Sequence, residues 1–201
     1  MQHKKMLKRL RWPLTARLLA RRMCGAAGGE DARLVASSLA DLARSARTGG
    51  VHEIALRASE DLVCNNLMCE QIGGACVCKL ARFMDGMARV QRMDVAANRL
   101  TVLPDSVWER RTLAHLDASD NLLTTLPPAV AQLGGSLRVL RLARNRLSGL
   151  PAELAQLPAL AELDLRGNPL TAADGALLAG LAQLRPSLRV LVGDEMNDMN
   201  E

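Results

Sequence analysis

The chain repeats one pattern of apolar and polar residues five times between residues 90 and 192. The five copies begin at Val90, Leu113, Leu137, Leu160 and Leu188. Their starts therefore lie 23, 24, 23 and 28 residues apart. Within each copy a short segment alternates apolar and polar positions, as in a strand with one buried face. One such coil cannot bury its own apolar side, so the pattern predicts coils that stack and share a column of inward side chains.

An asparagine follows the strand segment in each of the first four copies. These residues are Asn98, Asn121, Asn145 and Asn168. A carboxamide both donates and accepts hydrogen bonds, so a stack of them can satisfy the backbone groups of buried turns. We therefore expect a structural ladder of asparagines rather than a set of catalytic groups.

The shared spelling LxxLxLxxNxLxxLP resembles that of leucine-rich repeats, in the subgroup with about 23 residues per repeat that plant proteins and Ras regulators carry. The likeness is close over residues 90–192 and loose over residues 51–89. It implies an α/β solenoid with short parallel strands on a concave face, helices or 3-10 turns on the convex face, and helical caps. It also implies a binding module, because members of this family mostly recognise other proteins through the concave sheet.

The sequence that precedes the regular repeats predicts a capped first coil. This N-terminal segment comprises residues 30–89. Within it, Glu30–Arg47 places its apolar residues on one face of a helix, with acids in the first turn. Val51 then begins a degenerate repeat, in which Ser59 stands in the place of the asparagine. We expect the helix to cap the open end of the stack.

The sequence after the fourth copy predicts a second cap. A helix is expected to begin at Thr171, and a last strand with the sequence LRVLV follows it. Residues 193–201 hold four acids and few apolar side chains. This segment is predicted to be a disordered acidic tail.

Residues 1–29 carry most of the positive charge of the chain. They include eight basic residues and no acidic one, so the net charge of +5 becomes about −3 for the remainder. Leu7, Leu10, Leu14 and Leu18 recur at helical spacing among arginines, a pattern typical of a mitochondrial presequence. We therefore predict a targeting leader. A solvated basic tail and an arm that binds RNA phosphates are the alternatives, whereas the repeats themselves lack a basic excess.

The composition predicts an aliphatic core and speaks against an enzyme. Of the 201 residues 49% are hydrophobic, yet there is no Tyr, one Phe and two Trp, so Leu, Ala, Val and Met must form the core. No large cofactor pocket is expected, and no cofactor. The three histidines are scattered and no nucleophile neighbours a base, so we predict no catalytic residue. No apolar run approaches the roughly 18 residues of a membrane-spanning helix.

Five cysteines, an odd number, favour a reducing compartment over a disulfide scaffold. Four of them lie close together in the sequence: Cys64, Cys69, Cys76 and Cys78. Four thiolates could surround a zinc ion, but the spacing C-x4-C-x6-C-x-C is not that of the common zinc knuckles. We predict no metal and expect these cysteines to pack as small apolar residues in the core.

The polar strand positions predict a mixed-charge surface on the concave face. The candidate protein-binding residues, which point away from the core, are Arg92, Asp94, His115, Asp117, Arg141, Glu162, Asp164 and Arg166. Because neighbouring strands lie about 4.8 Å apart, Arg141 is within reach of both Asp117 and Asp164. Asp94, beside Asp117, has no obvious partner. Two interpretations stay open: solvated charges that pair with one another, or a docking strip for one specific protein.

One convex segment departs from the repeat. Two copies place a leucine in a buried convex slot, Leu133 and Leu157, where the earlier copy has Arg110. Because an unpaired arginine is costly to bury, we expect this segment to turn outward. It would then expose Trp108, Arg110 and Arg111 together as a contact site. Local repacking, with Trp108 covering its own core, is the alternative.

Taken together, these features predict a non-catalytic protein-binding module. With the leader, the first hypothesis is a mitochondrial accessory or assembly subunit of a larger complex, such as a respiratory complex or the mitochondrial ribosome. The second is a cytosolic signalling adaptor. The third is an RNA-associated protein that binds through residues 1–29. The step from fold to function is an analogy in each case.

Overall fold

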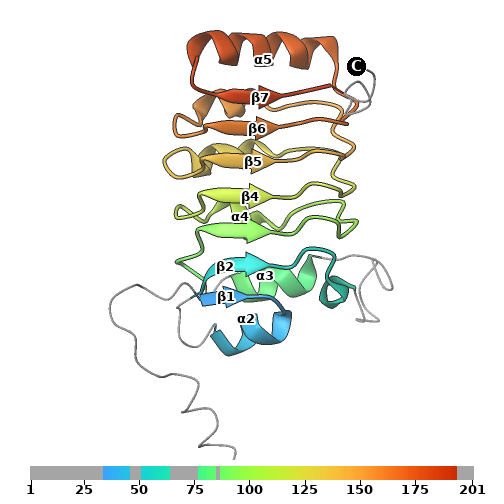
Figure 1. The fold of residues 1–201 in the computed structure, drawn as a ribbon, viewed down its shortest axis with the longest axis vertical. Coiled ribbons are helices and arrows are strands. Elements are labelled where there is room, and N and C mark those ends of the chain that lie inside the picture. Colours follow the sequence, from blue (N-terminus) through green and yellow to red (C-terminus); the bar gives the residue numbers. More distant parts are fainter. Residues whose placement is uncertain (1–33, 46–50, 64–76, 85–86, 194–201) are drawn as a thin grey trace, which may run out of the picture. The chain divides into compact units, whose positions relative to one another are not determined.

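The computed structural model describes residues 34–45, 51–63, 77–84 and 87–193. In this part of the chain seven short strands form one parallel sheet, in sequence order from β1 to β7 (Figure 1). The strands are β1 (Leu34–Ala36), β2 (Val51–Ala55), β3 (Arg92–Asp94), β4 (His115–Asp117), β5 (Val139–Arg141), β6 (Glu162–Asp164) and β7 (Arg189–Leu191). Because each strand pairs with the next one in the same direction, the chain must return across the back of the sheet after every strand. The predicted solenoid of stacked coils is therefore confirmed.

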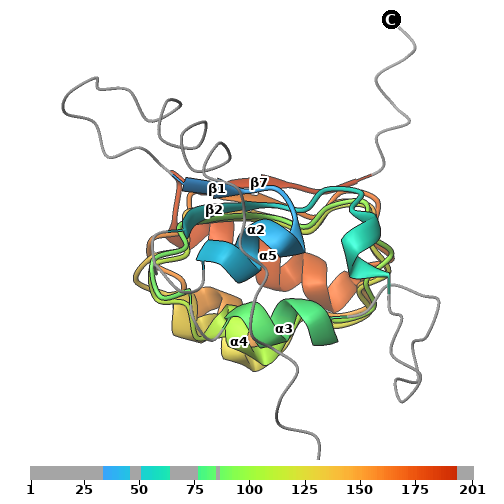
Figure 2. The ribbon, with the colours of Figure 1, turned by 90° about the horizontal axis from the view of Figure 1, so that it is seen from below.

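Helices and 3-10 turns form the returning segments. They are α2 (Leu39–Ser45), η1 (Glu60–Leu62), α3 (Cys78–Met84), α4 (Asp105–Trp108), η2 (Pro128–Leu133), η3 (Ala152–Gln156) and α5 (Ala172–Leu184). Figure 2 shows the sheet on one side and α3 and α4 on the opposite side. This arrangement matches the expected α/β solenoid, in which strands line one face and helices or 3-10 turns line the other.

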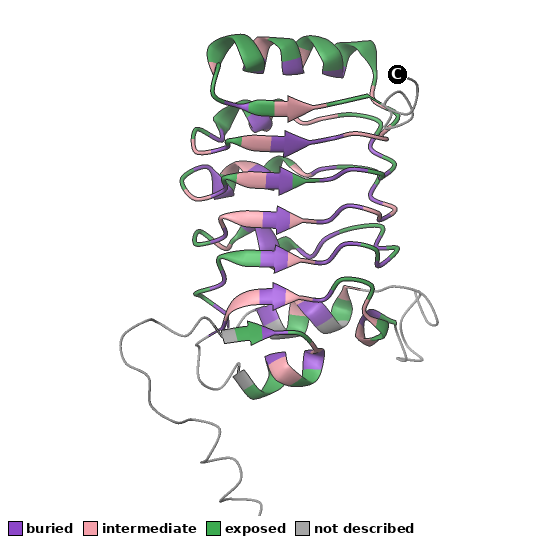
Figure 3. Ribbon diagram, viewed as in Figure 1, coloured by how far each residue is buried: buried purple, intermediate pink, exposed green. Residues whose placement is uncertain are grey.

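The middle side chain of each regular strand points into the interior. Met93, Leu116, Leu140 and Leu163 are register neighbours from β3 to β6, and each is at most 2% exposed. Figure 3 shows a buried band along the middle of the strands, and in β6 the burial continues into Asp164, which is 5% exposed. Each such burial contributes about 1.5–3 kcal/mol relative to an exposed side chain. The column is thus the continuous core that the leucine spacing predicts.

The N-terminal cap differs from the prediction of one helix over Glu30–Arg47. Its first described residues form β1, which pairs in parallel with β2 and leaves Val35 52% exposed. Within the described part of this segment, residues 34–45, the helix covers Leu39–Ser45 and buries Leu39 and Leu42 as expected. The helical prediction is wrong for Leu34–Ala36, because the edge of the sheet offers this segment backbone hydrogen-bond partners that no local period reveals.

The C-terminal cap begins where the sequence predicts. Thr171 caps α5, and the Asp174 carboxylate in turn accepts a hydrogen bond from the Thr171 N–H at 2.8 Å. The last strand is also present, but its register differs by one residue from the repeat alignment, since Asp164 pairs with Leu191 instead of Val192. Val190 therefore takes the inward position beside Leu163, where the alignment places Leu191.

Several predictions concern residues outside the described part of the chain. The leader, the acidic tail from residue 194 onward, and Cys64, Cys69 and Cys76 all lie there. Cys78 is described and is exposed at the start of α3, so its predicted place in the core is wrong. The first turn of α3 turns this side chain outward, while Leu80 fills the interior. Within the described ranges, no cluster of three or more His, Cys, Asp or Glu could hold a metal ion.

None of the helices in the described ranges is long and apolar enough to cross a membrane.

Candidate functional site

The outward side chains of the strands form one surface, which we call the sheet face. Parallel pairing in register places Arg92, His115, Val139, Glu162 and Arg189 in one column. A second column, two residues further along each strand, contains Asp94, Asp117, Arg141, Asp164 and Leu191. Arg166 follows β6 on the same face. All eight predicted binding residues therefore lie on one surface.

An arginine from the degenerate first coil pairs with Asp94, for which the sequence suggests no obvious partner, and with the neighbouring Asp117. The Arg57 Nε lies 3.0 Å from Asp94 Oδ2, and its Nη2 lies 2.9 Å from Asp117 Oδ2. The expectation of an unpaired acidic spot is therefore wrong. Because β2 and β3 pair in register, Arg57 stands in the column of Ala96. The repeat that begins at Val51 thus places Arg57 on the sheet face, although the alignment does not fix which carboxylates this arginine selects.

Arg141 pairs with neither of the aspartates that lie within its reach. Its Nε lies 2.8 Å from Glu162 Oε1, in the adjacent column of β6. Asp164 is bound instead by Arg166, with Nη2 to Oδ2 at 2.8 Å and Nε to Oδ1 at 3.0 Å. Asp117 is likewise occupied by Arg57. Arg141 consequently turns to the remaining carboxylate of the neighbouring strand.

The aspartates of the second column also fix the turns that leave the strands. Asp94 Oδ1 accepts a hydrogen bond from the Ala96 N–H at 3.0 Å, and Asp117 Oδ1 accepts one from the Ser119 N–H at 3.0 Å. Such a bond to the backbone two residues on is the usual way in which Asp stabilises a turn. These carboxylates thus have a structural role beside any role in binding.

Electrostatics on the sheet face follow from these neighbours. Burial, and then the charges of Arg92 and Arg141, lower the pKa of His115, which favours its neutral form near pH 7. Burial alone would raise the pKa of Asp164, but the hydrogen bonds and charge of Arg166 outweigh it and lower this pKa. The sheet face therefore presents fixed arginines and carboxylates around a neutral histidine.

Two shallow hollows of about 340 Å³ each lie on the sheet face. Asp117 and Arg141 line both of them and so stand between them. His115 lines one hollow, whereas Ser119 and Ala143, both at most 7% exposed, line the other. Small side chains at the base and charged ones around it form a surface that can receive side chains of a partner protein.

The four predicted asparagines form a ladder of hydrogen bonds behind the strand exits. The Asn121 Nδ2 donates to the carbonyl oxygens of Val95 and Ala118, each at 3.0 Å. Its Oδ1 accepts from the Leu100 N–H at 2.8 Å and from the Asn98 N–H at 3.2 Å. Each amide thus joins its own turn to the neighbouring one, which leaves it no role toward a ligand.

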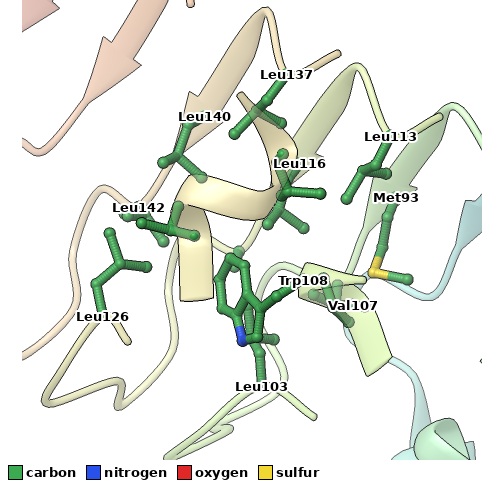
Figure 4. Packing of buried hydrophobic residues seen from close by; sticks show 14 of the residues in the cluster. Met93, Leu103, Val107, Trp108, Leu113, Leu116, Leu126, Leu137, Leu140 and Leu142 are labelled. Carbon is green, nitrogen blue, oxygen red and sulfur yellow. The ribbon is translucent and has the colours of Figure 1, made fainter. Parts of the chain in front are cut away.

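The convex segment with Trp108 does not turn outward. Trp108 is 1% exposed and lies among Leu103, Val107, Leu126 and other core residues (Figure 4). The predicted exposure of Trp108 is therefore wrong, and the repacking alternative describes the segment. The large indole fills interior space, since the slot that a leucine fills in later coils holds an arginine here.

The two arginines of this segment differ from each other. The Arg110 side chain is only 13% exposed, and its Nε donates to the Ser106 carbonyl oxygen at 2.9 Å. Its guanidinium thereby caps the short helix α4 at the rim of the core. Arg111 is exposed. The structure consequently does not bring Trp108, Arg110 and Arg111 together as one exposed patch.

The sequence matches the family model described as leucine rich repeat over residues 111–170 and again over residues 135–186. No curated protein matches it. Two solved structures show the same fold: internalin C2 of Listeria monocytogenes and the ectodomain of the receptor kinase GASSHO1/SCHENGEN3 of Arabidopsis thaliana, the latter in complex with CASPARIAN STRIP INTEGRITY FACTOR 2. Identity is 20% and 23%, and the TM-score 0.51 and 0.52, respectively.

Each of these two matches covers 74% of this chain, but only 54% of the internalin and 16% of the receptor ectodomain. A leucine-rich-repeat protein of Leptospira interrogans matches with 29% identity and a TM-score of 0.48, over 54% of this chain and 26% of its own. The chain therefore spans about half or less of these relatives' length. The protein contains leucine-rich repeats and has the fold of a leucine-rich-repeat solenoid.

Proposed function

Because the chain carries leucine-rich repeats, which support a role as a protein–protein interaction module, we propose that it binds a partner protein through the sheet face and catalyses no reaction. The observation that carries this proposal is the fixed array of charges across five strands of that face. Arg57, Arg141 and Arg166 are each held by a carboxylate at 2.8–3.0 Å. The array is thus ordered before a partner arrives.

These ion pairs do little for the stability of the fold. The Arg57 and Arg141 side chains are 49% and 48% exposed, and exposed pairs contribute at most about 1 kcal/mol. Their larger effect is to hold long side chains in one conformation, which lowers the entropy lost on binding. A partner with alternating acidic and basic side chains could exchange with these pairs. Charge complementarity then selects the partner more than it raises affinity.

A charge reversal at the centre of the sheet face tests this proposal. We expect Asp117→Lys to abolish capture of the partner, because it repels Arg57 and Arg141 and alters both hollows. Glu109→Lys on the convex side makes the same change at a side chain that is 62% exposed, and should leave capture unchanged. Quantitative mass spectrometry of proteins retained by each variant is the measurement. Equal loss with both variants, or with neither, would contradict binding by this face.

We further propose that the protein is a mitochondrial accessory or assembly subunit of a larger complex. The support is the acid-free, arginine-rich sequence of residues 1–29. A reporter fused to these residues should enter mitochondria, whereas a leader with Arg11, Arg17, Arg21 and Arg22 changed to Gln should not. A reporter that stays outside would instead favour the cytosolic adaptor. RNA binding that disappears when residues 1–29 are deleted would favour the basic arm.

A further inference from the structure

The C-terminal edge of the sheet carries an apolar hollow that the proposed function does not use. It has a volume of about 550 Å³ and lies between α5 and β7. Gly175, Ala179 and Ala182 line it from the helix, and Val190 and Val192 line it from the last strand. Among the residues that the structure describes, no charged side chain contributes to its lining. Terminal coils of solenoids usually present a polar outer surface, so an apolar one indicates that another chain covers it.

The strand beside this hollow has an open edge. The Arg189 N–H and the Leu191 carbonyl oxygen bond to the preceding coil, each with an N···O distance of 2.8 Å. Because alternate residues of a strand point to opposite edges, the backbone groups of Val190 and Val192 point away from β6. No other described residue bonds to them. In Figure 1 α5 lies beyond β7, and in Figure 2 it lies behind the sheet, so it leaves this edge uncovered.

The positively charged Arg189 lies at the start of β7, the strand with the open edge. Arg189 is exposed, and no ion pair joins it to another described residue. Its register neighbour on β6 is Glu162, but that carboxylate is bonded to Arg141 at 2.8 Å. An acidic side chain on a strand added at the open edge would therefore meet a cation that has no competing partner among the described residues.

We propose that this edge binds an extended segment of a partner protein, which adds to β7 as a further parallel strand. An acidic residue of the segment faces Arg189, and apolar residues one and three positions later enter the hollow beside Val190 and Val192. Main-chain hydrogen bonds to β7 supply affinity, while the hollow and the arginine supply specificity, as in other cases of strand addition. The apolar hollow itself is not part of the charged sheet face, whereas Arg189 belongs to that face and also borders the open edge.

The chain itself contains a strand with the required spacing. Glu162 is followed by Leu163 and Leu165, so a peptide of residues 158–168 has an acid and two apolar residues at the right positions. We expect this labelled peptide to bind the full chain in a fluorescence anisotropy titration. Val192→Lys should raise its Kd at least about tenfold, since a buried lysine would lie in the hollow. Val102→Lys is the matched control, because both valines are 53% exposed, and it should change Kd less than about twofold.

A charge exchange tests the register of the added strand. Arg189→Glu should weaken binding of this peptide, and a peptide with Glu162→Lys should regain affinity for that variant but not for the unchanged chain. No binding at roughly 1 mM peptide, or equal binding to the Val192→Lys variant, would overturn the proposal. So would a concentration-dependent dimer of the chain that Val192→Lys disrupts, because the edge would then be occupied by a second copy.

Discussion

The inward and outward side chains of the same strands follow different rules. Inward, Met93, Leu116, Leu140 and Leu163 repeat one chemical type, and the asparagine ladder repeats one set of hydrogen bonds behind them. Outward, the register column of Asp94 and Asp117 changes sign at Arg141. The choice of interior side chains is constrained because each coil must pack against its neighbour. The outward side chains face water, which solvates positive and negative charges alike. Stability should therefore depend on the interior and partner choice on the sheet face.

The largest effect is expected from Trp108→Ala. It removes a 1% exposed indole and leaves a cavity between two coils, which costs about 3–5 kcal/mol of unfolding free energy. Urea denaturation followed by circular dichroism measures this loss. Trp108→Phe is the matched control. Because the indole Nε1 has no hydrogen-bond partner among the described residues, the phenylalanine variant should retain more than half of the unfolding free energy that the alanine variant loses. A cost below about 1 kcal/mol for the alanine variant would show that Trp108 is not part of the core.

Asn121→Ala should come second. Its amide serves two coils, and its loss leaves the Val95 and Ala118 carbonyl oxygens and the Leu100 N–H without this partner. Since each buried unsatisfied group costs about 1–3 kcal/mol, we expect a loss of about 2–4 kcal/mol after partial relaxation. Asn168→Ala, at the half-buried last rung, should cost less in the same urea titration. Equal losses of unfolding free energy for the two variants would mean that the contribution of an asparagine does not depend on how deeply it is buried.

The contrast between interior and face also explains how far the sequence could predict the structure. Repetition makes the interior predictable: four asparagines and the leucine column recur, so each copy supports the interpretation of the others. Trp108 was harder to place, because a missing leucine can be replaced from a neighbouring position of the same turn. Packing density decides whether such a segment turns outward or repacks, and the spacing of residues in the sequence does not give the packing density.

The charge pairs of the sheet face were predicted only in part. Which residues lie on it follows from the two-residue period of a strand. Which carboxylate each arginine selects depends on rotamers and on competitors, as Arg141 shows by pairing with Glu162. The role of Arg57 was not predicted because its coil departs from the repeat pattern. The strand β1 was not predicted because it is stabilised by its pairing with β2, which the sequence of residues 34–36 does not show. A pattern among neighbouring residues does not predict which segments distant in the sequence pair with each other.

Asp164→Asn should have an intermediate effect, because this carboxylate lies on the sheet face yet is only 7% exposed. Losing its charge weakens the bonds from Arg166 and should cost about 1–2 kcal/mol at pH 7. The folded-state pKa of Asp164 is lowered, so its contribution is present above the unfolded value of about 3.9 and is lost as the pH falls through the folded value. The difference between the two proteins should therefore shrink in urea titrations from pH 5 toward pH 2.

The exposed Asp105 provides the control for this titration. Asp105→Asn makes the same chemical change at the start of α4, where the described structure gives the carboxylate no ion pair. It should alter the unfolding free energy by less than about 0.5 kcal/mol at pH 7. A difference for Asp164→Asn that stays constant over the acid range would show that the ionised carboxylate is not what stabilises the turn.

Arg57→Ala should have the smallest effect on stability. It therefore distinguishes most clearly between the interior, which sets stability, and the sheet face, which is proposed to bind the partner. Both of its ion pairs are partly exposed, so the unfolding free energy should fall by less than about 1 kcal/mol in the urea titration. Capture of the partner should fall much further, because Asp94 and Asp117 lose the cation that positions them. Arg44→Ala, at another exposed arginine paired with an aspartate, should change neither. If Arg57→Ala lowered stability as much as Asn121→Ala, the sheet face would be part of the structural framework, and its charges would no longer identify a binding surface.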